Sequence, residues 1–260
     1  GMGEVYRARD GKLGREVAIK VLPEAFAENE ERLARFKRDA KVLASLNHPN
    51  IAQIFDLGKV DESYFIALEY ISGKDMKTIF ERSRRIGEKV SIPRVCYVIM
   101  KVCEGLGHAH HKKDANGGDL NIVHRDVSPQ NVLISYEGEC KIIDFGIAKL
   151  LQEATLTPLE NVTQTGVMIG TPHYMAPEQI DGASRVDERA DLFALGVILY
   201  EMCSGFRPFE GASVWALLEA LRQVSHIPIQ ERAPKTPPHL VRAIEACLIR
   251  DPLHRVPDTE

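Results

Sequence analysis

Three short motifs in a fixed order constrain this chain more than any other feature of its sequence. H-R-D-V-S-P-Q-N occupies residues 124–131, D-F-G occupies residues 144–146, and A-P-E occupies residues 176–178. The first two motifs carry the carboxylates of Asp126 and Asp144 and the amide of Asn131, which are oxygen groups that accept protons and bind hard cations. Because order and spacing must match together, the set is far more specific than any one motif.

These motifs resemble the catalytic domain of eukaryotic-like protein kinases of the bacterial Ser/Thr type, and the likeness extends over nearly the whole chain. The resemblance implies an α+β fold of two lobes that form one domain. Residues 1–71 would be a small, mainly antiparallel β lobe with one helix, and residues 72–260 a larger, mainly helical lobe. It also implies transfer of the γ-phosphoryl group of ATP to Ser/Thr hydroxyls of protein substrates. ATP and Mg2+ are therefore the expected cofactors.

The resemblance assigns roles to the polar residues of the motifs. Asp126 would orient the substrate hydroxyl and take its proton, for which an ordinary Asp pKa suffices at neutral pH. Asn131 and Asp144 would bind Mg2+ through oxygen atoms. His124 is interpreted as a scaffold residue rather than a base. Ser128 stands where many Ser/Thr kinases have a lysine, so a cation that would stabilise the transferring phosphate is missing.

The first residues resemble the second half of a glycine-rich loop, so the sequence is expected to be a fragment. Gly1, Gly3 and Val5 would close over the ATP phosphates, because backbone without Cβ can approach phosphate oxygens closely. The V-A-I-K motif at 17–20 would place Ala18 against the nucleotide and Lys20 on its phosphates.

A helix is predicted over residues 30–46, where apolar residues recur at steps of three and four. By resemblance this is helix C, whose glutamate pairs with the strand lysine. Nineteen residues after Lys20, the chain has Asp39 instead. The shorter side chain predicts a looser pair or a shifted helix, and the alternative is that Asp39 is a solvated surface charge.

Strands are predicted over residues 4–10, 16–22, 51–58 and 64–70. By the same resemblance, the last strand leads into the segment that would contact adenine, with Leu68 at the back of the nucleotide site. Glu69 and Ile71 would offer backbone groups to adenine, Asp75 would reach the ribose, and Leu133 would contact the nucleotide.

A core helix is predicted over residues 92–112, and His108, His110 and His111 crowd its end. Histidines at this position are typical of a response to the helix dipole, and metal binding by His108 and His111 is the less favoured alternative. Residues 113–121 are predicted to be an exposed loop, and residues 228–238 a connection between helices.

The segment between D-F-G and A-P-E carries the predicted regulation. Thr163 and Thr165 resemble paired phosphorylation sites, and a phosphothreonine would bind Arg125 beside the catalytic aspartate. The alternative is that these threonines are ordinary polar loop residues. Thr171 resembles the threonine that contacts the base in Ser/Thr kinases, which favours Ser/Thr over Tyr substrates.

The resemblance implies structural roles for three further residues. Asp191 lies in an apolar run and, as in the family, would accept hydrogen bonds from backbone N–H groups of the catalytic loop, residues 124–131. Arg255 would pair with Glu178 of the A-P-E motif.

Charge and cysteine content exclude some other classes. A net charge of −4 without a basic stripe argues against nucleic-acid binding, and no apolar run is long enough for a membrane segment. Five cysteines without a C-x-x-C pair favour a reducing, cytoplasmic location, although the parent protein could be anchored elsewhere in its chain.

Two other functions stay open. One is a nucleotide-binding regulatory module with weak catalysis, suggested by Asp39 and Ser128, and the other is a small-molecule phosphotransferase of related fold. Protein substrates, and self-association of two copies for trans-autophosphorylation, are the expected partners.

Overall fold

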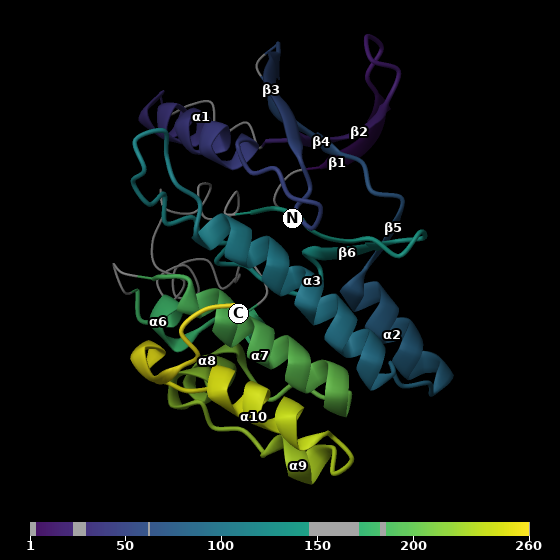
Figure 1. The fold of residues 1–260 in the computed structure, drawn as a ribbon, viewed down its shortest axis with the longest axis vertical. Coiled ribbons are helices and arrows are strands. Elements are labelled where there is room, and N and C mark those ends of the chain that lie inside the picture. Colours follow the sequence, from purple (N-terminus) through teal and green to yellow (C-terminus); the bar gives the residue numbers. More distant parts are fainter. Residues whose placement is uncertain (1–3, 23–29, 62, 146–171, 183–185, 260) are drawn as a thin grey trace.

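The computed structural model describes residues 4–22, 30–61, 63–145, 172–182 and 186–259. Its N-terminal part is an antiparallel four-stranded sheet in the order β1-β2-β4-β3 (Figure 1). Asp10 shapes the first turn, because its carboxylate accepts the N–H groups of Lys12 (3.0 Å) and Leu13 (3.1 Å). The predicted strands are confirmed with small shifts of their ends. They are β1 (Val5–Arg9), β2 (Glu16–Val21), β3 (Ile54–Val60) and β4 (Ser63–Glu69).

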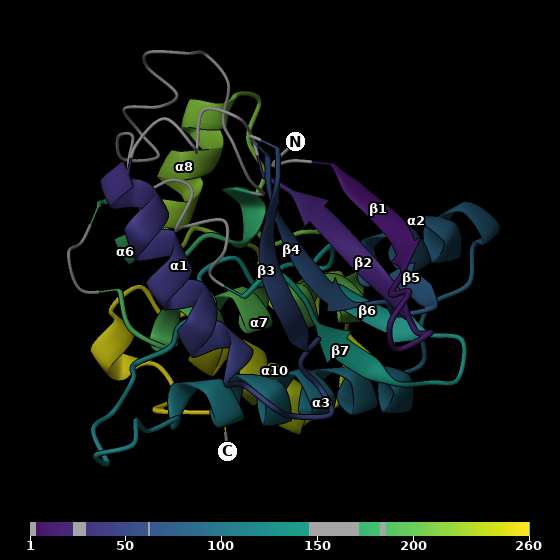
Figure 2. The same cartoon turned by 90° about the horizontal axis from the view of Figure 1, so that it is seen from above.

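One long helix, α1 (Glu30–Ala44), accompanies this sheet and lies beside β3 (Figure 2). Phe36, Ala40 and Leu43 are buried at steps of four and three, so they form the apolar stripe that packs inward. The predicted helix is therefore confirmed, although it ends at Ala44 rather than Leu46.

The rest of the described chain is mainly helical (Figure 1). The predicted connection over residues 228–238 is partly wrong, because it contains the one-turn helix α9. The helices are α2 (Met76–Ile86), α3 (Ile92–His110), α6 (Pro177–Ile180), α7 (Arg189–Ser204), α8 (Val214–Gln223), α9 (Ile229–Arg232) and α10 (Pro238–Cys247), with the 3-10 turns η2 (Pro172–Tyr174) and η3 (Pro252–His254).

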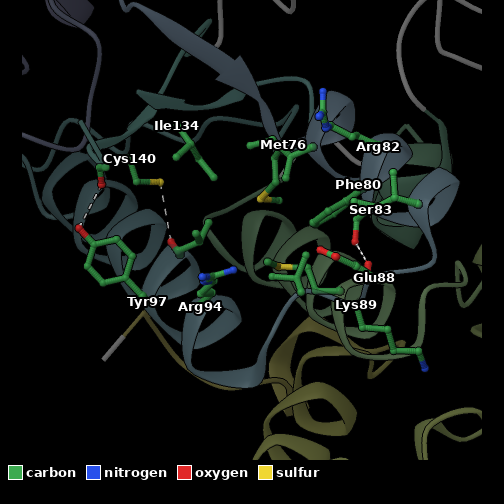
Figure 3. Close-up of a pocket in the computed structure, with 16 residues that line it drawn as sticks. Met76, Phe80, Arg82, Ser83, Glu88, Lys89, Arg94, Tyr97, Ile134 and Cys140 are labelled. Atoms are coloured by element: carbon green, nitrogen blue, oxygen red, sulfur yellow. Dashed lines mark hydrogen bonds between the residues drawn. The ribbon is translucent and has the colours of Figure 1, made fainter. Parts of the chain in front are cut away.

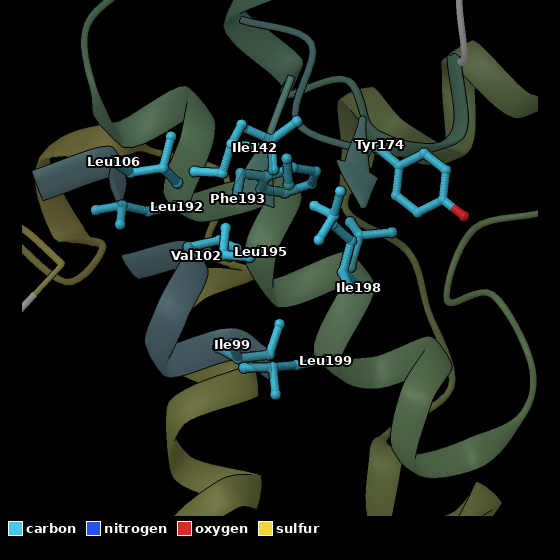
Figure 4. Close-up of a cluster of buried hydrophobic side chains, with 14 of the residues drawn as sticks. Ile99, Val102, Leu106, Ile142, Tyr174, Leu192, Phe193, Leu195, Ile198 and Leu199 are labelled. Atoms are coloured by element: carbon cyan, nitrogen blue, oxygen red, sulfur yellow. The ribbon is translucent and has the colours of Figure 1, made fainter. Parts of the chain in front are cut away.

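Helix α7 is the centre of the helical part, since every residue from Ala190 to Ser204 is buried. Its apolar side chains meet those of α3 in the core shown in Figure 4. Helix α10 packs closely on another side of α7, where a Cβ at Gly196 would lie 2.6 Å from the Cβ of Cys247. Any side chain at Gly196 would therefore push these helices apart.

A small antiparallel sheet joins the two parts. It consists of β5 (Gly73–Asp75), β6 (Val132–Ser135) and β7 (Cys140–Ile142), in that order. Ile51, which precedes β3, forms an isolated bridge to Ile142 of β7. This sheet is thereby held directly below the N-terminal strands.

All five cysteines are unpaired, as the sequence predicts. Within the described ranges, no helix is both long and apolar enough to cross a lipid bilayer.

Candidate active site

The hairpin of β6 and β7 brings the first two motifs together. Residues 124–131 lead into β6, and Asp144 follows β7. Val132 lies opposite Ile142 in the antiparallel pair, and the N–H of Ile143 donates to the carbonyl of Asn131 (2.9 Å). Asn131 and Asp144 therefore lie at the same edge of the small sheet.

The carboxylate of Asp126 is held by its neighbour in the same motif. Asn131 Nδ2 donates to Asp126 Oδ2 (3.0 Å) and to the Asp126 carbonyl (2.8 Å). Burial raises the pKa of Asp126, while His124 and the hydrogen bond from Asn131 act in the opposite direction. This corrects the expectation of an ordinary pKa, because desolvation of the carboxylate is a tertiary effect.

His124 has the scaffold position that the sequence predicts. Its ring is buried against Phe145 and its Nδ1 accepts the N–H of Asp126 (3.2 Å). Its Nε2 lies 3.0 Å from the carbonyl of Ile143, which requires the proton on Nε2. The imidazole thus links the catalytic loop to the strand that ends at Asp144.

Lys20 reaches this site from β2. Its Nζ lies 2.7 Å from Asp144 Oδ2, and the lysine side chain is only 6% exposed. In the strand register Lys20 pairs with Val5 of β1, and Ala18 pairs with Leu68 of β4. The structure therefore gathers Val5, Ala18, Lys20 and Leu68 on adjoining strands.

The expected ion pair between Lys20 and Asp39 is not formed between these two described residues. Asp39 lies 3.6 Å from Arg38 Nε and its side chain is 33% exposed. An aspartate side chain is one methylene shorter than a glutamate side chain, so α1 would have to move closer to bring the carboxylate to Lys20. Asp144 instead provides the carboxylate that compensates the buried ammonium group.

Two site residues have backbone conformations that side chains rarely adopt. The φ angle is +67° at Arg125 and +60° at Asp144. Such strain persists only where surrounding structure stabilises it. Asp191 provides part of this support, because its carboxylate accepts the N–H groups of His124 (2.9 Å) and Arg125 (2.8 Å).

Two supporting residues were missed in the sequence. His110 lies in the last turn of α3, as predicted, and its Nε2 is also 2.9 Å from Asp191 Oδ2, so His110 holds this carboxylate in place. Gln179 Nε2 donates to the carbonyl of Arg125 (2.8 Å). Both contacts join residues more than 50 positions apart, and nothing in the local sequence of either residue indicates them.

Glu178 and Arg255 meet in a buried, bidentate pair. Arg255 Nη1 and Nη2 donate to the two carboxylate oxygens of Glu178 at 2.6 and 2.8 Å. Arg255 also donates to the carbonyls of Arg189, Ile249 and Arg250. This arginine connects the A-P-E motif to the start of α7 and to the segment that follows α10.

The segment that begins at Glu69, the last residue of β4, has contacts that the sequence does not indicate. Glu69 Oε1 lies 2.9 Å from Lys141 Nζ of β7, and the Glu69 N–H donates to the carbonyl of Gln53 (2.8 Å). The N–H of Glu69 is thus occupied, which restricts its contact with a ligand to the carbonyl. Leu133 of β6 pairs with Asp75 of β5 and so lies below this segment.

Asp75 is the N-cap of α2 as well as a candidate ribose contact. Its carboxylate accepts the Thr78 N–H (2.9 Å) and the Thr78 hydroxyl (2.6 Å). Helix capping alone explains an aspartate at this position, so the ribose contact stays a prediction.

The donor atoms at the site fit Mg2+. The Nδ2 of Asn131 is occupied by Asp126, which leaves its Oδ1 for a cation, and Asp144 has a second carboxylate oxygen besides the one near Lys20. No group of three His, Cys, Asp or Glu that could hold a metal ion occurs in the part of the chain that the structure describes. Mg2+ does not need such a group, because one or two carboxylates commonly hold it together with phosphates and water.

Ser128 is buried at the site, and its Oγ has no hydrogen-bond partner among the described residues. A buried hydroxyl without a partner costs free energy, so this atom is a candidate for contact with a group that approaches the catalytic loop. Gly1, Gly3, Thr163, Thr165 and Thr171 lie outside the described residues, and their predicted roles stay predictions.

Comparisons with known proteins cover the whole of this site. A family model described as "Protein kinase domain" matches residues 1–259. The chain is 39% identical to "Tyrosine-protein kinase MasK" of Myxococcus xanthus (strain DK1622), in an alignment that covers 100% of this chain and 40% of that protein. It is 34% identical to "Serine/threonine-protein kinase PrkC" of Bacillus subtilis (strain 168), and that alignment covers 100% of this chain and 37% of that protein. The chain thus spans about two fifths of the length of these relatives.

Solved structures agree with the sequence comparison. The crystal structure of the Mycobacterium tuberculosis PknI kinase domain matches with a TM-score of 0.72 at 26% identity, covering 100% of this chain and 88% of that one. The predicted α+β fold, with an antiparallel N-terminal sheet and a larger helical part, is thereby confirmed.

Proposed function

The chain belongs to the protein kinase domain family, and on that premise we propose that it transfers the γ-phosphoryl group of ATP to serine and threonine hydroxyls of proteins. The observation that supports this most is the direct contact of Asp126 with Asn131 and of Asp144 with Lys20 at one edge of the small sheet. These four side chains are the ones with chemical tasks in phosphoryl transfer. Residues 1–71 and 72–260 would be the two lobes of this one domain.

In this proposal Asp126 accepts the proton of the substrate hydroxyl as its oxygen bonds to the γ-phosphorus and the bond from that phosphorus to the oxygen of ADP breaks. Asn131 holds the Asp126 carboxylate in place and, with Asp144, provides the oxygen atoms that bind Mg2+. The metal, when bound, neutralises charge on the phosphate oxygens. Lys20 exchanges part of its contact with Asp144 for the α- and β-phosphates.

The nucleotide would lie between the N-terminal sheet and the small sheet. Val5 and Ala18 from above and Leu133 from below would enclose the adenine, with Gly1 and Gly3 near the phosphates. The carbonyl of Glu69 and the backbone of Ile71 would bind the adenine edge, and Asp75 the ribose. Backbone groups suffice because adenine presents one donor and one acceptor there.

Regulation by phosphorylation of Thr163 and Thr165, with Arg125 as the cation that binds the phosphate, is part of the proposal. Two copies of the chain would associate and phosphorylate each other. Thr171 and the buried hydroxyl of Ser128 would contact the substrate side of Asp126.

The five free cysteines support a reducing, cytoplasmic location.

The choice of hydroxyl is the point on which the relatives differ, since one is named a tyrosine kinase and another a serine/threonine kinase. The purified protein should be incubated with Mg-ATP and generic protein substrates, and the phosphate located by mass spectrometry beside an Asp144→Asn control. Phosphoserine and phosphothreonine that depend on Asp144 support the proposal. Phosphotyrosine alone would replace it with tyrosine-kinase activity, and ATP binding without any phosphate would favour a regulatory module.

The Lys20 contacts lead to a prediction for Asp39. Asp39→Glu lengthens the carboxylate by one methylene, which gives Lys20 a second partner and releases Asp144 for metal. We expect kcat/KM to rise about fivefold, corresponding to roughly 1 kcal/mol of transition-state stabilisation. Asp39→Asn is the matched control and should bring no gain. An Asp39→Glu variant no faster than the unmodified protein would show that this helix position does not limit catalysis.

The raised pKa of Asp126 predicts an unusual pH dependence. Below its pKa the carboxyl is protonated and cannot accept the hydroxyl proton, so kcat/KM should fall as the pH decreases through that pKa. Because burial shifts the pKa upward, the fall should lie above the ordinary Asp value of about 4. The measurement is kcat/KM against pH, with circular dichroism to confirm folding at each pH. An activity that stays constant down to the ordinary Asp range would contradict the upward shift of the Asp126 pKa.

A further inference from the structure

An apolar groove lies on the helical part, between α2, α3 and the turn after β6 (Figure 3). It has a volume of about 480 Å³. Its walls include Met76 and Phe80 of α2, Val98 of α3, Ile134 of β6 and Met202 of α7. The proposed reaction uses none of these side chains.

The groove is elongated rather than round. A second hollow of about 300 Å³ shares Phe80, Val90 and Met202 with the first and continues to Gly205 and Phe206 at the end of α7. Ile86, 55% exposed, adds an apolar side chain at the edge. An open, elongated apolar surface suits an extended or helical segment better than a compact small molecule.

The rim of the groove is basic. Arg82, Lys89 and Arg94 line it and are exposed, and none of them forms an ion pair with another described residue, whereas Arg84 is bound to Glu201 at 2.5 Å. Figure 3 shows Arg82, Arg94 and Lys89 around the apolar side chains. Glu88 is the one acidic residue among those that line the first hollow. The lining therefore carries three positive charges against one negative charge.

We propose that this groove is a docking site for an acidic, apolar peptide segment of a protein partner. Leucine, methionine or phenylalanine side chains of the segment would be buried against Met76, Phe80 and Met202, which provides affinity. Aspartate or glutamate beside them would contact the unpaired cations, which provides selectivity and speeds association. Binding at this surface does not depend on phosphoryl transfer, so it goes beyond the proposed function and can be tested separately.

The test measures binding rather than activity. A short fluorescein-labelled peptide, with glutamates interleaved among leucine, methionine and phenylalanine, is titrated with the purified protein and followed by anisotropy. Two control peptides replace the glutamates with lysine or the apolar residues with serine. We expect the first peptide alone to bind measurably, with an affinity that falls as salt increases.

Two protein variants locate the site. Arg82→Glu combined with Arg94→Glu should weaken binding at least about tenfold, because it reverses the charge of the rim. Ile86→Ser should weaken it through loss of apolar contact. Lys235→Glu combined with Arg242→Glu, at two exposed cations that do not line the groove, is the control with the same change of charge and should bind as the unmodified protein does.

Several results would overturn the proposal. These are equal binding of the serine-substituted peptide, unchanged binding by both groove variants, or no binding of the acidic, apolar peptide by a folded protein. Self-association in analytical ultracentrifugation that is lost in the Arg82→Glu, Arg94→Glu variant would assign the groove to a second copy of this chain instead. Thermal unfolding of each variant confirms that lost binding does not reflect lost folding.

Discussion

Replacing Asp126 with asparagine is expected to lower kcat for phosphoryl transfer about 100- to 10,000-fold, the range typical of a removed general base. The amide cannot take the hydroxyl proton, but its oxygen can still accept the hydrogen bond that Asn131 donates to this side chain. The geometry of the loop should therefore be retained. The affinity for ATP should change little, because in the proposed mechanism Asp126 acts on the substrate hydroxyl and Lys20 on the phosphates.

The same substitution should not destabilise the fold. Burial raises the pKa of Asp126 in the folded protein, so ionisation of this carboxyl at neutral pH costs stability that an amide does not cost. The measurements are single-turnover transfer, nucleotide affinity by calorimetry, and urea unfolding. Asp119→Asn, in an exposed loop, is the control and should leave all three unchanged. An Asp126→Asn variant that retained more than about a tenth of the rate would exclude Asp126 as the base.

The second large effect concerns stability. Arg255→Leu is expected to lower the free energy of unfolding by about 3–5 kcal/mol, because it leaves a buried carboxylate without its counter-charge. The side chain of Arg255 is fully buried and that of Glu178 is 11% exposed, and three backbone carbonyls also lose their donors. Urea unfolding followed by circular dichroism measures the loss.

A surface pair of similar length provides the control. Lys101 and Glu104 are 2.7 Å apart with side chains 29% and 43% exposed, so Lys101→Ala should cost less than about 1 kcal/mol. Adding Glu178→Leu to Arg255→Leu should recover part of the loss, because the uncompensated charge is then removed. If Arg255→Leu were no more costly than Lys101→Ala, the buried pair would not contribute to stability as described.

Much of the fold is predictable from local patterns. The hairpin of β1 and β2 and the helices α1 and α3 all follow from the spacing of apolar residues over a few turns or strands. The short helix α9 does not, since one turn between prolines carries too few residues to show a period. A helix or strand is therefore predictable when its pattern of apolar residues repeats several times, and α9 is too short for such a repeat.

The residue types of the candidate site were also readable in the sequence, because H-R-D, D-F-G and V-A-I-K each place their chemical groups within a few adjacent positions. Tertiary structure decided which of these groups meet. Lys20 contacts Asp144 rather than Asp39, since the separation of β2 from α1 sets the carboxylate that a buried ammonium group can reach. No local pattern encodes that separation.

Sequence alone therefore determined the chemistry that the chain carries and the family to which it belongs, because both reside in short contiguous motifs. Only the folded structure decided the raised pKa of Asp126, the support of Asp191 by His110, and the apolar groove with its basic rim beside α2. Each of these depends on desolvation or on contact between distant segments. Both are properties of packing that appear only when the two sheets and the helical core come together.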